Sequence, residues 1–217
     1  MTLLRIAVLG AESTGKSSLI QSLARELTQL GHEVRTVDEY LRAWCANEGR
    51  TPLAHEQVSI ALEQTRQVLA ASGNKLPHSA TSVLLSDTTA LMTAIYSEVL
   101  FGDGSLLEYG LTQQKTFDLT LVTGMDLPWV ADGLQRDGAD SQAPIDQRLR
   151  QVLVQHSLPF HVVYGVGPQR THSALRLLQR RLGTLPPSPD QAPWTCDKCS
   201  DPGCEHRLFT GLIQPQP

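Results

Sequence analysis

Apolar residues recur along the chain in short, β-branched runs that are separated by longer stretches with helical spacing. The short runs predict buried strands and the longer stretches predict helices. The predicted strands cover residues 3–9, 32–38, 81–87, 118–123 and 160–166. The predicted helices cover residues 16–30, 54–72, 88–101 and 145–156. Strands that alternate with helices are typical of an α/β fold with a doubly wound, five-stranded parallel sheet.

The helix prediction for residues 54–72 depends on Val58, Leu62 and Leu69, which fall on one stripe at helical spacing. Gly31 follows the first predicted helix as a plausible terminating glycine. In an open parallel sheet, ligands bind at the carboxyl ends of the strands. The residues that follow each predicted strand are therefore the candidates for function.

Two stretches depart from this alternation. Residues 124–143 are rich in Gly, Asp and Gln and predict a mobile loop or lid. Residues 185–193 (LPPSPDQAP) form a proline-rich connector that cannot continue a helix. The expected organisation is a nucleotide-binding domain over residues 1–184, the connector, and a cysteine-rich tail over residues 194–217.

Composition narrows the class of protein. The chain has 217 residues, with 41% hydrophobic and 18% charged residues, which suits one globular domain. A net charge of -4 and a pI near 5.9 give no basic footprint, so we expect no nucleic-acid partner. The apolar run at residues 3–9 contains Arg5 and is too short for a signal peptide or a membrane span. We expect a cytoplasmic protein with reduced thiols and no membrane partner.

Residues 10–17 read GAESTGKS and match the P-loop pattern G-x-x-x-x-G-K-[ST] in full. The motif follows a predicted strand and opens a predicted helix, which is the context that it requires. Lys16 is expected to reach the β- and γ-phosphates of ATP, and the Ser17 hydroxyl to ligate Mg²⁺. The expected nucleotide contacts are Gly10, Glu12, Ser13, Thr14, Gly15, Lys16, Ser17 and Ser18.

Carboxylates follow two further strands. Asp87 closes the third predicted strand, where it can hold Mg²⁺ or cap the helix that begins near Thr88. Asp38 and Glu39 follow the second strand, where a carboxylate of a nucleoside kinase can take the proton of the acceptor hydroxyl. A solvated turn is the alternative, and the sequence does not choose between the two acids.

The predicted lid contains an unusual segment, MDLPWVADGLQRDG, at residues 125–138. Trp129 can stack on a flat ligand or pack in the core. Asp132 can bind sugar hydroxyls, and Arg136 can bring a cation to the transferring phosphoryl group.

Two later features extend the predicted nucleotide site. Arg148 and Arg150 lie in the helix after the lid, where either can face a phosphate or both can face solvent. Residues 165–170 (GVGPQR) predict a turn that can hold adenine.

The tail contains Cys196, Cys199, Cys204 and His206, a Cys₃His set suited to tetrahedral Zn²⁺. Because no ligand position is left open, the expected zinc is structural and would fold a segment too short for its own core. Free or redox-active thiols and disulfides are the alternatives. Cys45 lies in an apolar helical context and is expected to be a buried hydrophobe.

Four stretches together resemble one family: AESTGKSSL at 11–19, VDEYLR at 37–42, SDTTAL at 86–91 and DLPWVADGL at 126–134. This combination resembles the bacterial ribosylnicotinamide kinases and related stand-alone P-loop ATPases, over about residues 3–182. The resemblance implies a nucleoside-kinase type of sheet. It also implies transfer of the ATP γ-phosphate to the 5′-hydroxyl of nicotinamide riboside, a step of NAD biosynthesis.

Carried over by position, the resemblance implies that residues 10–18 hold ATP and Mg²⁺, and that Asp38 or Glu39, with Tyr40, faces the nucleoside. It implies that Asp87 lies near the metal and that the loop at 129–136 approaches the nucleoside. The insert at 102–114 and the cysteine tail depart from the family pattern. A regulatory ATPase that switches a protein partner, with the zinc tail as docking module, is the alternative function.

Overall fold

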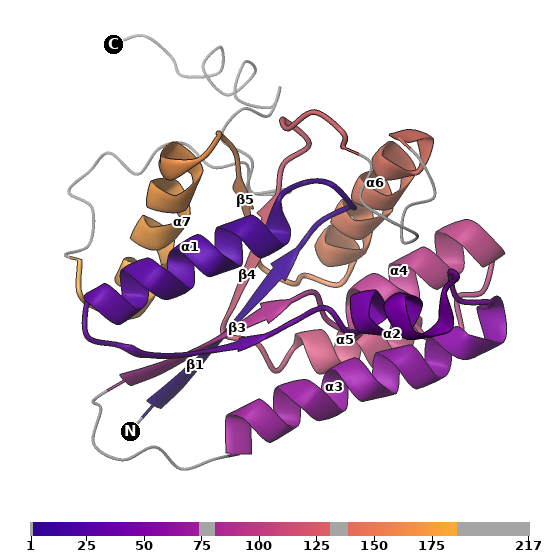
Figure 1. Cartoon of the computed structure of the whole chain (residues 1–217), viewed down its shortest axis with the longest axis horizontal. Coiled ribbons are helices and arrows are strands. Elements are labelled where there is room, and N and C mark those ends of the chain that lie inside the picture. Colours follow the sequence, from indigo (N-terminus) through magenta and orange to yellow (C-terminus); the bar gives the residue numbers. More distant parts are fainter. Residues whose placement is uncertain (1, 74–80, 131–138, 186–217) are drawn as a thin grey trace, which may run out of the picture.

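The computed structural model describes residues 2–73, 81–130 and 139–185. Its centre is a five-stranded parallel sheet in the order β2-β3-β1-β4-β5, with helices on both faces (Figure 1). The predicted doubly wound α/β sheet is therefore confirmed. The strands are β1 (Thr2–Leu9), β2 (Glu33–Val37), β3 (Thr81–Asp87), β4 (Leu119–Thr123) and β5 (His161–Val163).

The four predicted helices are present with shifted ends, and three further helices among the described residues were not predicted. Those predicted are α1 (Lys16–Gln29), α3 (Gln57–Gly73, after a 3-10 turn at Ala54–Glu56), α4 (Ala90–Phe101) and α6 (Ala139–Gln155). The others are α2 (Tyr40–Glu48), α5 (Leu107–Gln114) and α7 (Pro168–Arg181). α2 and α5 are short and bury few residues, so their periodicity is weak. α5 occupies most of the insert at 102–114.

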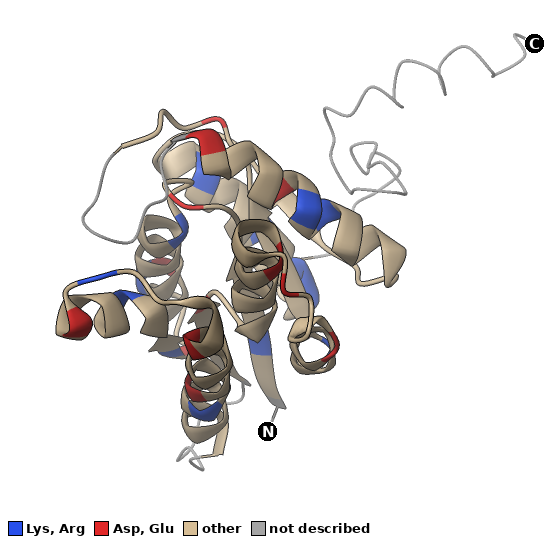
Figure 2. Ribbon diagram, turned by 90° about the vertical axis from the view of Figure 1, so that its right-hand side faces the viewer, with Lys and Arg blue, Asp and Glu red and all other residues tan. Residues whose placement is uncertain are grey.

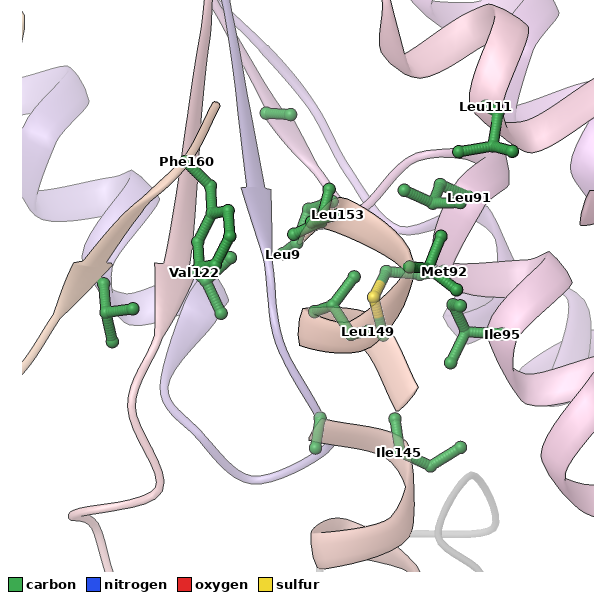
Figure 3. Close-up of a cluster of buried hydrophobic side chains, with 14 residues drawn as sticks. Leu9, Leu91, Met92, Ile95, Leu111, Val122, Ile145, Leu149, Leu153 and Phe160 are labelled. Atoms are coloured by element: carbon green, nitrogen blue, oxygen red, sulfur yellow. The ribbon is translucent and has the colours of Figure 1, made fainter. Parts of the chain in front are cut away.

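Alternation along β1 divides the core between the two faces of the sheet. Leu4, Ile6 and Val8 point to the face that α1 and α7 cover, whereas Ala7 and Leu9 point to the face that α4 and α6 cover. Figure 3 shows this second cluster, in which the α6 side chains pack between β1, β4 and α4. Burying both faces of the central strand fixes the register of the sheet, because a slip by one residue would exchange the two sets. The carboxyl end of β1, where the P-loop begins, is thereby fixed as well.

The structure corrects the predicted buried face of α3. Val58, Leu62 and Leu69 are exposed, although they recur at helical spacing. The buried residues of this helix are Gln57, Ile60, Ala61, Gln64 and Val68. The helix was predicted correctly but its inner face was not, because two of the inward side chains are polar glutamines.

The predicted loop at 124–143 also ends earlier than expected. α6 begins at Ala139 and includes Pro144, which the sequence analysis placed before the helix. A proline near the start of a helix removes a hydrogen bond but does not prevent the helix from forming. The connector and the cysteine tail lie outside the described residues, so the zinc site at Cys196, Cys199, Cys204 and His206 stays a prediction.

Figure 2 shows Lys, Arg, Asp and Glu interspersed over the described helices. None of these helices is both long and apolar enough to cross a membrane. Within residues 2–73, 81–130 and 139–185, no group of three or more His, Cys, Asp or Glu side chains is placed to hold a metal ion.

Candidate functional site

The P-loop joins β1 to α1, and its backbone conformation depends on glycine at two positions. Gly10 and Gly15 have φ angles of 145° and 79°, which residues other than glycine rarely adopt. A Cβ atom on Gly10 would lie 2.2 Å from the Thr123 hydroxyl oxygen at the end of β4. The loop is therefore shaped by close contact with its neighbouring strand, and its amides can point outward toward an anion.

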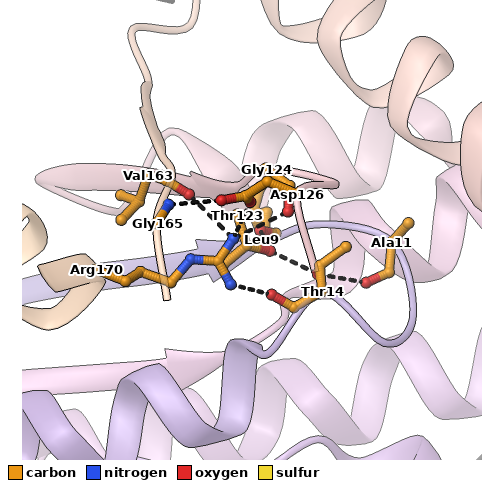
Figure 4. A network of polar contacts seen from close by, with 9 residues as sticks. All are labelled: Leu9, Ala11, Thr14, Thr123, Gly124, Asp126, Val163, Gly165 and Arg170. Atoms are coloured by element: carbon orange, nitrogen blue, oxygen red, sulfur yellow. Dashed lines mark hydrogen bonds and ion pairs between the residues drawn. The ribbon is translucent and has the colours of Figure 1, made fainter. Parts of the chain in front are cut away.

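A buried network ties the P-loop to the ends of β4 and β5 (Figure 4). The Thr14 hydroxyl lies 2.7 Å from the Thr123 hydroxyl and donates to the Ala11 carbonyl over 2.7 Å. Thr123 also donates to the Leu9 carbonyl. Arg170 of α7 donates to the Thr14 carbonyl over 2.6 Å. The phosphate-binding loop is therefore held by strand ends and by a helix far along the chain.

Arg170 is the centre of this network, and the sequence analysis did not single it out. It is 3% exposed and donates to the carbonyls of Gly124 and Val163 and to the Asp126 carboxylate, the last over 2.7 Å. Asp126 in turn accepts the Gly165 amide proton. Burial lowers the pKa of the Arg170 guanidinium, although the Asp126 carboxylate opposes that effect. The stretch at 165–170 is therefore not only a turn, because Pro168 begins α7 and Arg170 lies in the first turn of that helix.

Glu12 links the P-loop to α4 and α6. Its amide donates to the Tyr96 hydroxyl oxygen over 3.0 Å. Its carboxylate accepts from Ser141 and its carbonyl accepts from Gln142, both over 2.6 Å. The loop is thus supported on this side by the first turns of α6, which the sequence analysis placed in the lid.

Lys16 and Ser17 begin α1 after the carboxyl end of β1, and Asp87 ends the neighbouring strand β3. The Lys16 ammonium donates to the Ala11 carbonyl over 2.9 Å, within the P-loop. The Ser17 hydroxyl donates to one Asp87 carboxylate oxygen. The other carboxylate oxygen of Asp87 is buried without a hydrogen-bond partner among the described residues. A hydroxyl beside an under-coordinated carboxylate is an oxygen donor set that suits Mg²⁺, so these residues fit the predicted metal role.

A cavity of about 380 Å³ opens beside the P-loop, between α2, α3 and α4. This volume is within the usual range for a site that binds a small molecule. Polar and charged residues of the lining include Glu12, Lys16, Glu39, Arg42, Gln57 and Thr88. Apolar residues of the lining include Leu41, Cys45, Ile60, Met92, Tyr96 and Phe101. Cys45 is buried as predicted, and it forms part of this wall.

The structure separates the two acids that follow β2. Glu39 lines the cavity, and its carboxylate lies 3.6 Å from the Arg42 guanidinium. Asp38 is exposed and does not line the cavity. Gln64 of α3 fixes this corner, because its amide oxygen accepts the Tyr40 amide proton and its amide nitrogen donates to the Asp38 carbonyl.

The other predicted acceptor contacts are placed differently. The described residues that line the cavity do not include Tyr40, Asp87 or Trp129. Trp129 is half-buried, and its indole N–H has no hydrogen-bond partner among the described residues. The adjacent Val130 exchanges two hydrogen bonds with the Ser13 hydroxyl, so this segment rests on the P-loop. Asp132 and Arg136 lie outside the described residues.

The two arginines of α6 are engaged in ion pairs. Arg148 binds Glu98 of α4 through two nitrogens, over 2.9 and 2.7 Å. Arg150 binds Asp146 on its own helix over 2.8 Å. Both arginines therefore have structural partners within the described chain.

The site combines a P-loop with a cavity beside it, and the comparison with family models agrees with the first of these features. Residues 5–170 match the family model of an AAA domain. The chain belongs to this AAA domain family. The match includes the P-loop, the cavity walls and Arg170, and it confirms the resemblance to P-loop ATPases. No curated protein matches this chain.

Solved structures resemble this AAA domain at low sequence identity. A NadR protein in complex with NAD and AMP-PNP has a TM-score of 0.62 and 18% identity, covering 87% of this chain and 52% of that chain. A NadR protein in complex with NR has the same TM-score and identity, covering 88% and 54%. A deoxyadenosine kinase from M. mycoides, with products dCMP and a flexible dCDP bound, has a TM-score of 0.54 and 14% identity, covering 84% and 100%. The AAA domain chain therefore has the fold of these proteins and spans about half the length of the NadR chains.

Proposed function

We propose that this AAA domain transfers the γ-phosphate of ATP to a hydroxyl of a nucleoside, with nicotinamide riboside as the foremost candidate. The observation that carries the proposal is the cavity, which extends from Lys16 and Glu12 of the P-loop into an apolar pocket of a size that suits a nucleoside. An ATPase that only switches a protein partner does not need a cavity for a second small molecule beside its P-loop. The bound nucleosides and nucleotides of the solved structures with this fold support the same proposal.

In this proposal the donor side is held by the P-loop. Its amides and Lys16 bind the phosphates, and Arg170 and Thr123 keep the loop in shape. Ser17 and Asp87 would hold Mg²⁺, which would supply positive charge to stabilise the phosphates during transfer. The γ-phosphate is thereby directed toward the cavity that Lys16 lines.

The acceptor side is assigned to Glu39. Its carboxylate takes the proton of the acceptor hydroxyl while that oxygen forms a bond to the γ-phosphorus and the bond to the β-phosphate oxygen breaks. ADP then leaves with the displaced oxygen. Glu39 is preferred over Asp38 because it lines the cavity. Arg136 stays a predicted second cation for the transferring group, and Asp132 a predicted ligand of the sugar.

The test is ADP formation across a panel of nucleosides, with mass spectrometry of the products. Wild-type protein should form ADP and a phosphorylated nucleoside only when an acceptor is present. Glu39→Gln should lower kcat by about 100-fold or more, as expected for loss of a general base. Asp38→Asn is the matched control, since that side chain is exposed, and it should retain activity. ATP hydrolysis that no nucleoside accelerates would contradict the proposal and favour the regulatory switch.

A further inference from the structure

Two glutamines of α3 are buried at the cavity, but they differ in the hydrogen bonds that their amides form with the rest of the chain. Gln57 is 4% exposed and Gln64 is 2% exposed, and both line the cavity. The amide of Gln64 is occupied, since it accepts the Tyr40 amide proton over 2.8 Å and donates to the Asp38 carbonyl over 3.3 Å. No described residue forms a hydrogen bond with the amide of Gln57. Gln64 therefore has a structural role, whereas the amide of Gln57 is available to a ligand in the cavity.

The Gln57 side chain as a whole is buried, yet its amide atoms are not among the fully buried polar atoms that lack a partner, so the amide is open to the cavity. A methionine of similar length would fill the same position, so packing alone does not require a carboxamide here. The side chain of Gln57 is thus one that the folded chain alone does not require. A ligand in the cavity with a matching polar edge would satisfy it.

The position of Gln57 indicates which part of a nucleoside it would meet. Gln57 and Gln64 are two helical turns apart, which is about 10 Å along the axis of α3. Gln64 fixes the corner that carries Glu39, where the acceptor hydroxyl is to lose its proton. The lining residues nearest to Gln57 in sequence, Leu53 and Ile60, are apolar. This end of the cavity suits the base, which lies away from the 5′-hydroxyl.

We propose that Gln57 is the specificity-determining residue for the acceptor, and that it recognises an uncharged amide edge on the base. A glutamine carboxamide has one acceptor oxygen and two donor hydrogens, so it can form two hydrogen bonds with a ring carboxamide or with the amide edge of a pyrimidine or purine. A carboxylate in the same place would accept from the glutamine N–H but would leave the glutamine oxygen facing a like charge. This inference rests on the proposed function, because it places the nucleoside in this cavity.

The test compares two acceptors in two variants. Nicotinamide riboside carries the amide edge, and a riboside with an unsubstituted aromatic ring lacks it. Wild-type kcat/KM should favour the first by about 10- to 100-fold, the usual effect of leaving buried hydrogen-bonding groups unpaired. In Gln57→Met this ratio should fall to within about 3-fold, while the melting temperature changes little, because no hydrogen bond within the described chain is lost. Nicotinic acid riboside, with a carboxylate in place of the amide, should be a poor acceptor for the wild type.

Gln64→Met is the matched control. It leaves the Tyr40 amide and the Asp38 carbonyl unpaired, so it should lower the melting temperature and reduce activity on both ribosides by one common factor. The same pattern in Gln57→Met, or a wild-type preference that survives in Gln57→Met, would overturn the inference.

Failure of the proposed function has a separate outcome. If the wild type phosphorylates no riboside, calorimetric titration of the same ribosides in the presence of AMP-PNP decides the inference. An amide preference in binding that is lost in Gln57→Met would support it without kinase activity. Binding without that preference, or no binding, would contradict it.

Discussion

The sharpest structural prediction concerns Arg170, whose replacement by methionine should weaken both the fold and the P-loop. The substitution removes an ion pair with Asp126 and the donor to three carbonyls, one of them in the P-loop. Breaking a buried ion pair costs about 3–5 kcal/mol. The lower end applies here, because the Asp126 side chain is 30% exposed and keeps the Gly165 amide as a partner. We expect a loss of about 3 kcal/mol in the free energy of unfolding.

The functional part of this prediction follows from the bond to the Thr14 carbonyl. Without it the P-loop amides are less well ordered, so the KM for ATP should rise by about 10-fold or more. Urea denaturation and steady-state kinetics at varied ATP measure the two effects. Arg176→Met is the control, because Arg176 is exposed on the same helix and should change stability by less than about 0.5 kcal/mol. An Arg170→Met protein as stable as this control, with unchanged KM, would refute the role assigned to Arg170.

Three further predictions address the metal site, pH dependence and the core. Asp87→Asn should raise the Mg²⁺ concentration for half-maximal activity by about 10-fold or more, with little effect on overall stability, as measured by Mg²⁺ titration. Burial lowers the pKa of His161, with the Arg180 cation adding to the effect. In the unfolded chain His161 has its ordinary pKa of about 6.5, so it binds a proton there more readily than in the folded chain. The free energy of unfolding should therefore fall from pH 8 to pH 5.5 more steeply in wild type than in His161→Gln. Leu149→Ala, at a fully buried position between the sheet and α4, should lower the free energy of unfolding by about 2–5 kcal/mol in urea titrations without a change of fold.

The parallel sheet was predictable because its central strands β1, β3 and β4 are largely buried on both faces and therefore read as mainly apolar runs. The P-loop was predictable because its glycines and lysine have a fixed spacing. α7 was missed because Pro168 and its neighbouring glycines were interpreted as a turn, although proline is common at the first position of a helix. With that helix missed, the inward direction of Arg170 could not be inferred.

The cavity was harder to predict, because its lining does not follow the apolar pattern. The inner face of α3 carries Gln57 and Gln64, while apolar Val58, Leu62 and Leu69 face solvent. Periodicity alone assigns the buried face to the apolar residues, so for this helix it predicts that the exposed face is the buried one. The adjacent acids after β2 show the same limit, since only the fold shows that Glu39 lines the cavity and Asp38 does not.

The most direct test of the central claim follows the γ-phosphate itself. ATP labelled at the γ-position is incubated with the protein and nicotinamide riboside or another nucleoside of the panel, and the labelled products are separated. The account predicts that the label appears in a nucleoside monophosphate, in an amount equal to the ADP formed, and that Glu39→Gln lowers the rate of its formation by about 100-fold or more. Label that appears only as inorganic phosphate, at a rate independent of every nucleoside, would contradict it.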